Sequence, residues 1–104
     1  MVKKISQSEF SNVKSDNLAV VDFSAVWCGP CNMLAPVMEE LSGELEGKAS
    51  FYNVDVDENP ELAKEYGIMS IPAILIMKNG QQVDMQIGFQ PKESLKEAIE
   101  KFTN

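Results

Sequence analysis

Two cysteines, Cys28 and Cys31, are the residues of this 104-residue chain best able to do covalent chemistry. Gly29 and Pro30 separate them, and this spacing lets both sulfurs meet on one helical turn and close a small ring. A C-x-x-C pair suits thiol–disulfide exchange. Other interpretations are half of an intermolecular metal site, a structural disulfide or two inert thiols. A structural bridge across so short a loop stabilises little, which favours the redox interpretation.

The elements that must position the pair are predicted from its neighbours. Residues 18–26 form a nearly continuous apolar run with β-branched members, which is typical of a central strand buried on both faces. Apolar residues then recur at helical spacing from 34 to 45, so an amphipathic helix is expected to begin around the cysteines. Cys28 falls at its N-terminal end, where free N–H groups and the helix dipole favour a thiolate. Cys31 lies one turn further in, and we expect it to be more buried than Cys28.

Asp22 is a carboxylate inside the apolar strand. One interpretation is an aspartate at a strand end, exposed to solvent. The other is a buried acid, which is costly to ionise and tends to hold its proton.

The rest of the chain alternates strand and helix patterns without a repeat or a linker. The expected order is β-α-β-α-β-α-β-β-α, with an Asn79-Gly80 hairpin turn before the last strand. We predict a single domain over residues 1–104, of the α/β class, with a mixed sheet and helices on both faces. The expected strands cover residues 2–5, 18–26, 49–55, 71–77 and 81–87. Asn59 is the expected N-cap of the third helix, with Pro60 at its first position.

Composition removes several classes of function. The chain has no histidine, so neither a Ser-His-Asp nor a Cys-His hydrolase site is possible, and one chain cannot supply a four-ligand structural zinc site. Phosphate and dinucleotide loops are missing, and we expect no cofactor and no metal. The net charge of −7, with no arginine, argues against binding to nucleic acid or to a membrane surface. The polar start and the short apolar stretches lead us to expect a cytoplasmic protein.

Nearly the whole chain resembles the thioredoxin family, in order and without insertions. The resemblance is carried by five segments: Val21 to Ala25, the sequence Trp27-Cys28-Gly29-Pro30-Cys31, Tyr66-Gly67-Ile68, Ser70-Ile71-Pro72-Ala73 and Lys78-Asn79-Gly80. It implies the thioredoxin fold, a mixed five-stranded central sheet flanked by four helices. It also implies a protein-disulfide reductase in which Cys28 is the nucleophile and Cys31 the resolving cysteine.

The resemblance implies roles for other residues as well. Asp22 would take and return the proton of Cys31. Gly29 and Pro30, between the cysteines, would also belong to the catalytic site. Ile71–Pro72 would be a cis peptide bond facing the cysteines. The residues expected to dock substrate are Trp27, Ile71, Pro72, Gly88 and Phe89, together with Gly29 and Pro30.

The implied partners are oxidised client proteins and a thioredoxin reductase, either an NADPH-dependent flavoprotein or a ferredoxin-linked enzyme, and we expect a monomer. Two alternatives are a non-catalytic binding subunit with the same fold and a disulfide-forming oxidase.

Four positions depart from the common family pattern. Lysine is frequent at the positions of Asn32 and Asn53, a basic residue at that of Met69, and tryptophan at that of Ser24. The first three changes remove positive charge near the expected site. The sequence therefore predicts a less positive surface, an altered choice of reductase and altered protonation of Asp22.

Overall fold

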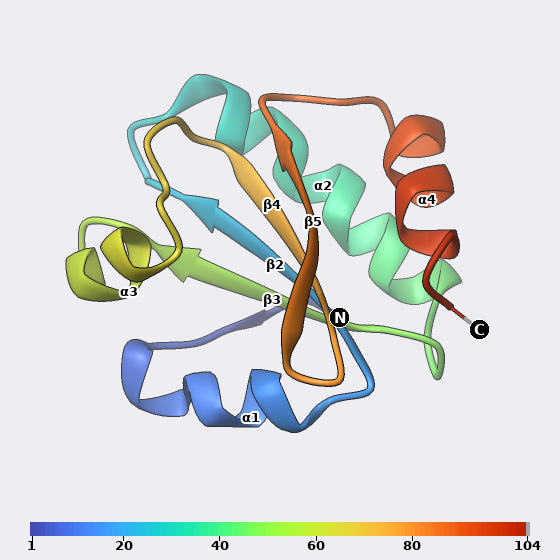
Figure 1. Ribbon diagram of the computed structural model, residues 1–104. Helices are drawn as coiled ribbons and strands as arrows, with labels where there is room; N and C mark the ends of the chain where they lie inside the picture. Colours follow the sequence, from blue (N-terminus) through green and yellow to red (C-terminus); the bar gives the residue numbers. More distant parts are fainter. Residues whose placement is uncertain (104) are drawn as a thin grey trace.

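The sheet that carries the site is built around strand β2 (Leu18–Ser24), as the computed structural model shows (Figure 1). The structure describes residues 1–103. β2 pairs in parallel with β3 (Ser50–Asp55) and antiparallel with β4 (Ala73–Lys78). β1 (Lys3–Lys4) extends the sheet beyond β3, and β5 (Gln81–Ile87) extends it beyond β4. The strand order β1-β3-β2-β4-β5 is thus a mixed five-stranded sheet, which confirms the expected fold class.

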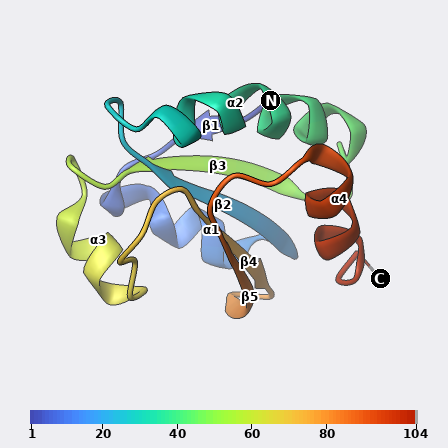
Figure 2. The ribbon, with the colours of Figure 1, turned by 90° about the horizontal axis from the view of Figure 1, so that it is seen from above.

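Helices cover both faces of this sheet. Their bounds are Gln7–Glu9 for the 3₁₀ helix η1, Phe10–Ser15 for α1, Gly29–Glu44 for α2, Pro60–Glu65 for α3 and Lys92–Glu100 for α4. Figure 2 separates α2 from α1 and α3 on opposite sides of the sheet. None of the helices within residues 1–103 is long and apolar enough to cross a membrane.

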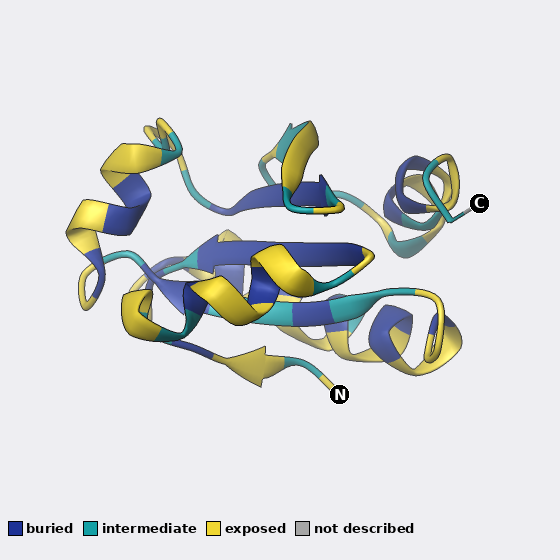
Figure 3. Cartoon of the chain, turned by 60° about the horizontal axis from the view of Figure 1, so that its bottom comes forward, coloured by how far each residue is buried: buried dark blue, intermediate teal, exposed yellow. Residues whose placement is uncertain are grey.

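Alternate residues of β2 supply the two hydrophobic cores, because successive side chains of a strand point to opposite faces. Val20 packs in one core with Leu34 of α2 and Leu95 of α4. Val21 packs in the other with Leu62 of α3. Figure 3 shows the central strands buried and the outer sides of the helices exposed. Asp22, which lies two positions after Val20 in β2, therefore lies on the face of the sheet that α2 covers.

Four of the five strands are shorter than the sequence pattern indicates, and the differences at β2 and β4 have a clear physical reason. The strand expected over residues 18–26 ends at Ser24, because the next residues turn into α2, with the Cys28 N–H donating to the Ala25 carbonyl at 3.2 Å. The strand expected over 71–77 begins at Ala73, after Pro72, which has no N–H to give to the ladder.

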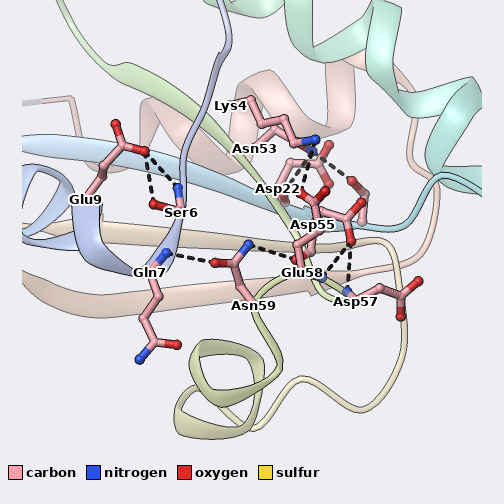
Figure 4. Close-up of polar contacts among 11 residues, drawn as sticks. Lys4, Ser6, Gln7, Glu9, Asp22, Asn53, Asp55, Asp57, Glu58 and Asn59 are labelled. Carbon is pink, nitrogen blue, oxygen red and sulfur yellow. Dashed lines mark hydrogen bonds and ion pairs between the residues drawn. The ribbon is translucent and has the colours of Figure 1, made fainter.

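Asn59 takes the expected N-cap position of α3, but its side chain does not cap the helix. Its Oδ1 accepts from the Gln7 N–H at 2.8 Å, and its Nδ2 donates to the Asp55 carbonyl at 3.0 Å (Figure 4). The buried amide therefore ties the start of α3 to η1 and to the end of β3.

Candidate active site

A disulfide joins Cys28 and Cys31 at the N-terminal end of α2, with the two Cα atoms 5.2 Å apart. Cys28 is the N-cap residue and has extended backbone, with φ −88° and ψ 111°. The Cys31 N–H donates to the Cys28 sulfur at 3.2 Å. Pro30 lies in the first turn, where its missing N–H costs no helical hydrogen bond. A backbone donor and the positive end of a helix are thus directed at the Cys28 sulfur, where they favour negative charge.

Cys31 is the more buried of the two cysteines, as expected, but only slightly, because Cys28 is buried as well in this disulfide form. Cys28 is 5% exposed and Cys31 3%. Ile71 and Val56 pack against the two cysteines and Ala25, and the Ile71 carbonyl oxygen lies 4.0 Å from the Cys28 sulfur. The two cysteines differ in their hydrogen bonding and hardly at all in their exposure.

The Ile71–Pro72 peptide bond beside the cysteines is cis, as the resemblance implies. The Gly88 N–H donates to the Pro72 carbonyl at 2.8 Å, and Gly88 has a φ of +87°, which favours glycine. Within residues 1–103, no backbone–backbone hydrogen bond uses the N–H or the C=O of Ile71. An extended peptide docked here could therefore pair with Ile71.

Trp27 precedes the cysteines and is 69% exposed. Its Nε1 donates to Asp57 Oδ2 at 2.7 Å, so a residue in the turn after β3 holds the indole. Sequence reasoning missed Asp57, because no local spacing connects two residues thirty positions apart. Phe89 is also exposed, directly after Gly88, as are Gly29 and Pro30.

Asp22 is buried, with 3% of the residue exposed, which excludes the interpretation as a surface aspartate. Among the described residues its Oδ1 has no hydrogen-bond partner. Burial raises the pKa of Asp22 to about 7, and the side chain of Asn53 opposes the rise. The carboxyl group can therefore exchange a proton near neutral pH.

A cavity of about 400 Å³ connects Asp22 to the redox pair, since both Asp22 and Cys31 line it. Ser24 and Asn53, two of the departures from the family pattern, line the same cavity. The two side chains are hydrogen-bonded to each other, with Asn53 Nδ2 donating to Ser24 Oγ at 2.8 Å. Asn53 Nδ2 also donates to the backbone carbonyl of Asp22 at 3.2 Å. The sequence predicted an effect on Asp22 from Asn53, but the bond to Ser24 was not foreseen.

No group of three or more histidine, cysteine, aspartate or glutamate side chains within residues 1–103 is arranged to hold a metal ion. The Cys28–Cys31 pair and the Asp22 carboxyl group, which lines the same cavity as Cys31, can support the chemistry of a dithiol with a nearby proton acceptor.

Comparisons with known proteins agree with this chemistry. A family model described as Thioredoxin matches residues 1–101. A thioredoxin of Staphylococcus epidermidis is 48% identical over 100 residues, which cover 96% of each chain, and one of Staphylococcus aureus has the same identity and coverage.

Solved structures show the same relationship. The thioredoxin of Malassezia sympodialis (Mala s 13) has a TM-score of 0.91 and 39% identity, and the match covers all of this chain and 92% of the other. A mutant thioredoxin from Halobacterium salinarum has a TM-score of 0.89 and 37% identity over 98% of this chain and 92% of the other. The chain therefore belongs to the thioredoxin family and is a dithiol redox carrier that reduces protein disulfides.

Proposed function

We propose that Cys28 is the attacking and Cys31 the resolving cysteine in this exchange. The Cys28 thiolate attacks one sulfur of a client disulfide, forms a mixed disulfide and releases one client thiolate. Cys31, as a thiolate, then attacks the Cys28 sulfur, and the second client thiolate leaves. The client gains two electrons and the carrier ends as the Cys28–Cys31 disulfide. The observation that carries this assignment is the 3.2 Å hydrogen bond from the Cys31 N–H to the Cys28 sulfur.

Asp22 is the group that takes the proton of Cys31 before the second attack. Support comes from the cavity that Asp22 and Cys31 both line, and from the pKa of Asp22, which burial raises to about 7. The proton then passes to solvent through the same cavity. Pro30 stiffens the first turn of α2, and Gly29 leaves room for the backbone of a client, since an added Cβ would meet nothing within 4 Å.

Clients dock as extended segments beside the disulfide. The backbone of Ile71, which has no backbone partner among the described residues, pairs with the client, as in strand addition. Pro72 and Gly88 hold this segment through their 2.8 Å hydrogen bond. Trp27 and Phe89 supply exposed apolar area.

We further propose that one domain, residues 1–104, acts as a monomer in the cytoplasm. A thioredoxin reductase regenerates the dithiol. Asn32 and Met69 are exposed and neutral, so they reduce the positive charge offered to that enzyme, whereas Asn53 lines the cavity. Assays with an NADPH-dependent flavoprotein reductase and a ferredoxin-linked one test this altered preference. Turnover at ordinary rates with the NADPH enzyme would contradict it.

The decisive experiment for the cysteine roles replaces Cys31 by Ser and searches a lysate for proteins trapped on Cys28. Many trapped mixed disulfides are expected. If none forms while partner binding persists, the chain uses its fold as a binding subunit instead. Reduction of insulin in the presence of dithiothreitol gives a simpler first readout, and wild type is expected to accelerate it.

A further inference from the structure

Three polar residues form a row across neighbouring strands next to the cavity. Lys4 of β1 is in register with Asn53 of β3, and Asn53 is in register with Asp22 of β2. Partners in a parallel ladder point to the same face, and Asp22 shares its face with Val20, which packs against α2. Lys3, in register with Tyr52, points to the opposite face. Figure 4 shows Lys4, Asn53 and Asp22 gathered at this place.

The row brings a cation within reach of the Asp22 carboxylate. Two strand spacings separate the backbones of Lys4 and Asp22 by about 10 Å. An extended lysine side chain spans about 6 Å on a flexible four-carbon stem. Lys4 and Asp22 both line the cavity, which offers the ammonium group a path to the carboxylate.

The charged groups around the cavity are not equally satisfied. Three carboxylates line it, from Asp22, Glu39 of α2 and Asp55 of β3. Glu39 accepts from the Val2 N–H at 3.0 and 3.1 Å. Asp55 Oδ1 accepts two backbone N–H groups, at 2.8 and 3.2 Å. Asp22 Oδ1, with no partner among the described residues, is the acceptor left open.

Lys4 is the cation among the residues that line the cavity, and its present partner is a weak one. Its Nζ lies 3.3 Å from Glu58 Oε1, and both side chains are mostly exposed, at 59% and 63%. Exposed ion pairs of this kind are screened by solvent and contribute little. The ammonium group can thus exchange Glu58 for a better-buried carboxylate.

We propose that Lys4 is a positioning residue for the resolving step, and that its ammonium group moves from Glu58 to the Asp22 carboxylate whenever Asp22 is ionised. The ion pair keeps Asp22 ready to accept the proton of Cys31. Once Asp22 holds that proton, the attraction is lost and Lys4 returns to Glu58. Asn53 stays between them, held by Ser24 and neutral. This inference rests on the proposed role of Asp22 as proton acceptor.

Single-turnover reduction of a protein disulfide, measured against pH, tests the inference with matched variants. Lys4→Met is expected to move the acidic limb of the profile upward by about half a pH unit, so that the rate on that limb falls about threefold. Glu58→Gln frees Lys4 and is expected to move the limb in the opposite direction. Lys3→Met, on the other face of the same strand, should leave the profile unchanged, and Lys4→Arg should restore it.

The same substitutions in a chain that also carries Asp22→Asn separate the inference on Lys4 from the proposed role of Asp22. In an Asp22→Asn chain, Lys4→Met is expected to have no further effect on the profile. If Lys4→Met and Lys3→Met behave alike while Asp22→Asn changes the profile, the inference on Lys4 is overturned and Asp22 keeps its role. If Asp22→Asn leaves the profile of wild type unchanged, the proposed role of Asp22 fails instead.

Discussion

The site has two sides that meet at Cys31, the disulfide side and the cavity side, and different groups control the chemistry of each. On the disulfide side, the Cys28 sulfur receives its hydrogen bond from a backbone N–H, and the surrounding Gly29 and Pro30 are exposed and carry no charge. On the cavity side, the properties of Asp22 depend on side chains, namely the amide of Asn53 and the burial around the carboxyl group.

This difference separates what any C-x-x-C helix start provides from what this chain adds. A helix N-terminus directs N–H groups and a positive dipole at its cap residue whatever the side chains are. Proton transfer needs side chains of suitable type and charge in one place. Substitutions on the disulfide side should therefore change the reactivity of the nucleophile or the shape of the surface around it. Substitutions on the cavity side should change the pH dependence of the reaction.

The largest effect is expected from Cys28→Ser. A serine hydroxyl is not ionised near neutral pH and forms no disulfide, so protein-disulfide reduction should fall by at least about a thousandfold. Stopped-flow measurement of a single turnover checks this. Cys31→Ser serves as the comparison, because it should still form one mixed disulfide per chain. Residual turnover by Cys28→Ser at more than a few per cent of wild type would show that Cys31 can attack clients by itself.

The next effect concerns stability and pH at Asp22. Burial raises its pKa from 3.8 to about 7 in the folded oxidised chain, so the folded chain keeps a proton that the unfolded chain releases in this window. The contribution of protonated Asp22 to the free energy of unfolding is therefore fully present below about pH 4 and is lost as the pH rises through about 7. Asp22→Asn should match wild type near pH 4 and gain about 2–4 kcal/mol in free energy of unfolding near pH 8.

Urea unfolding of the oxidised proteins at both pH values measures this gain. Glu97→Gln, on the exposed side of α4, is the control and should change stability equally little at both. A gain for Asp22→Asn that did not depend on pH would contradict the assignment of the raised pKa.

A smaller effect distinguishes two glycines at the site. Gly88 has a φ of +87°, so Gly88→Ala should lower the free energy of unfolding by about 1–2 kcal/mol. At Gly29 an added Cβ meets no atom within 4 Å, so Gly29→Ala should change stability by less than about 0.5 kcal/mol. Thermal unfolding of the two variants measures both values, and equal losses would mean that Gly29 is structural.

The smallest effect is expected at Asp57, which holds Trp27 by a 2.7 Å hydrogen bond. Asp57→Leu should free the indole and raise the KM for a protein client roughly threefold, with kcat little changed. Asp57→Asn retains an acceptor and should stay close to wild type. Reduction of a small synthetic disulfide is the control, because it needs no docking surface. A loss of kcat with both substrates would instead assign Asp57 to the chemical step.

Sequence patterns predicted most of the fold, because strand and helix periodicities are local properties. The apolar run from residue 18 and the Asn79-Gly80 turn were sufficient to identify β2 and the hairpin, in which Asn79 and Gly80 have positive φ, 51° and 82°. Boundaries were less accurate where a turn or a proline ends a ladder, as at Ser24 and Pro72.

The site was predictable only in part. Cys28, Cys31 and the cis peptide bond before Pro72 follow from a short motif and a family resemblance. The burial of Cys28 did not follow: Ile71 comes from a distant segment and packs against Cys28, so Cys28 is nearly as buried as Cys31.

Long-range side-chain pairs were not predictable from any spacing. The Asn53–Ser24 hydrogen bond depends on the register of β2 and β3, and the Trp27–Asp57 bond on the turn that follows β3. To predict such pairs one needs the order of the strands and the register between them, and a single sequence does not give either at the level of individual residues.

The most direct test of the account concerns the inequality of the two cysteines. The reduced chain is treated with iodoacetamide under limiting conditions, and mass spectrometry assigns the alkylated residue over time. The two cysteines are nearly equally exposed in the disulfide form, at 5% and 3%, and the expected difference in rate comes from the backbone N–H and the helix end directed at Cys28. Cys28 is expected to react at least about tenfold faster than Cys31. Equal rates, or faster alkylation of Cys31, would contradict the central claim.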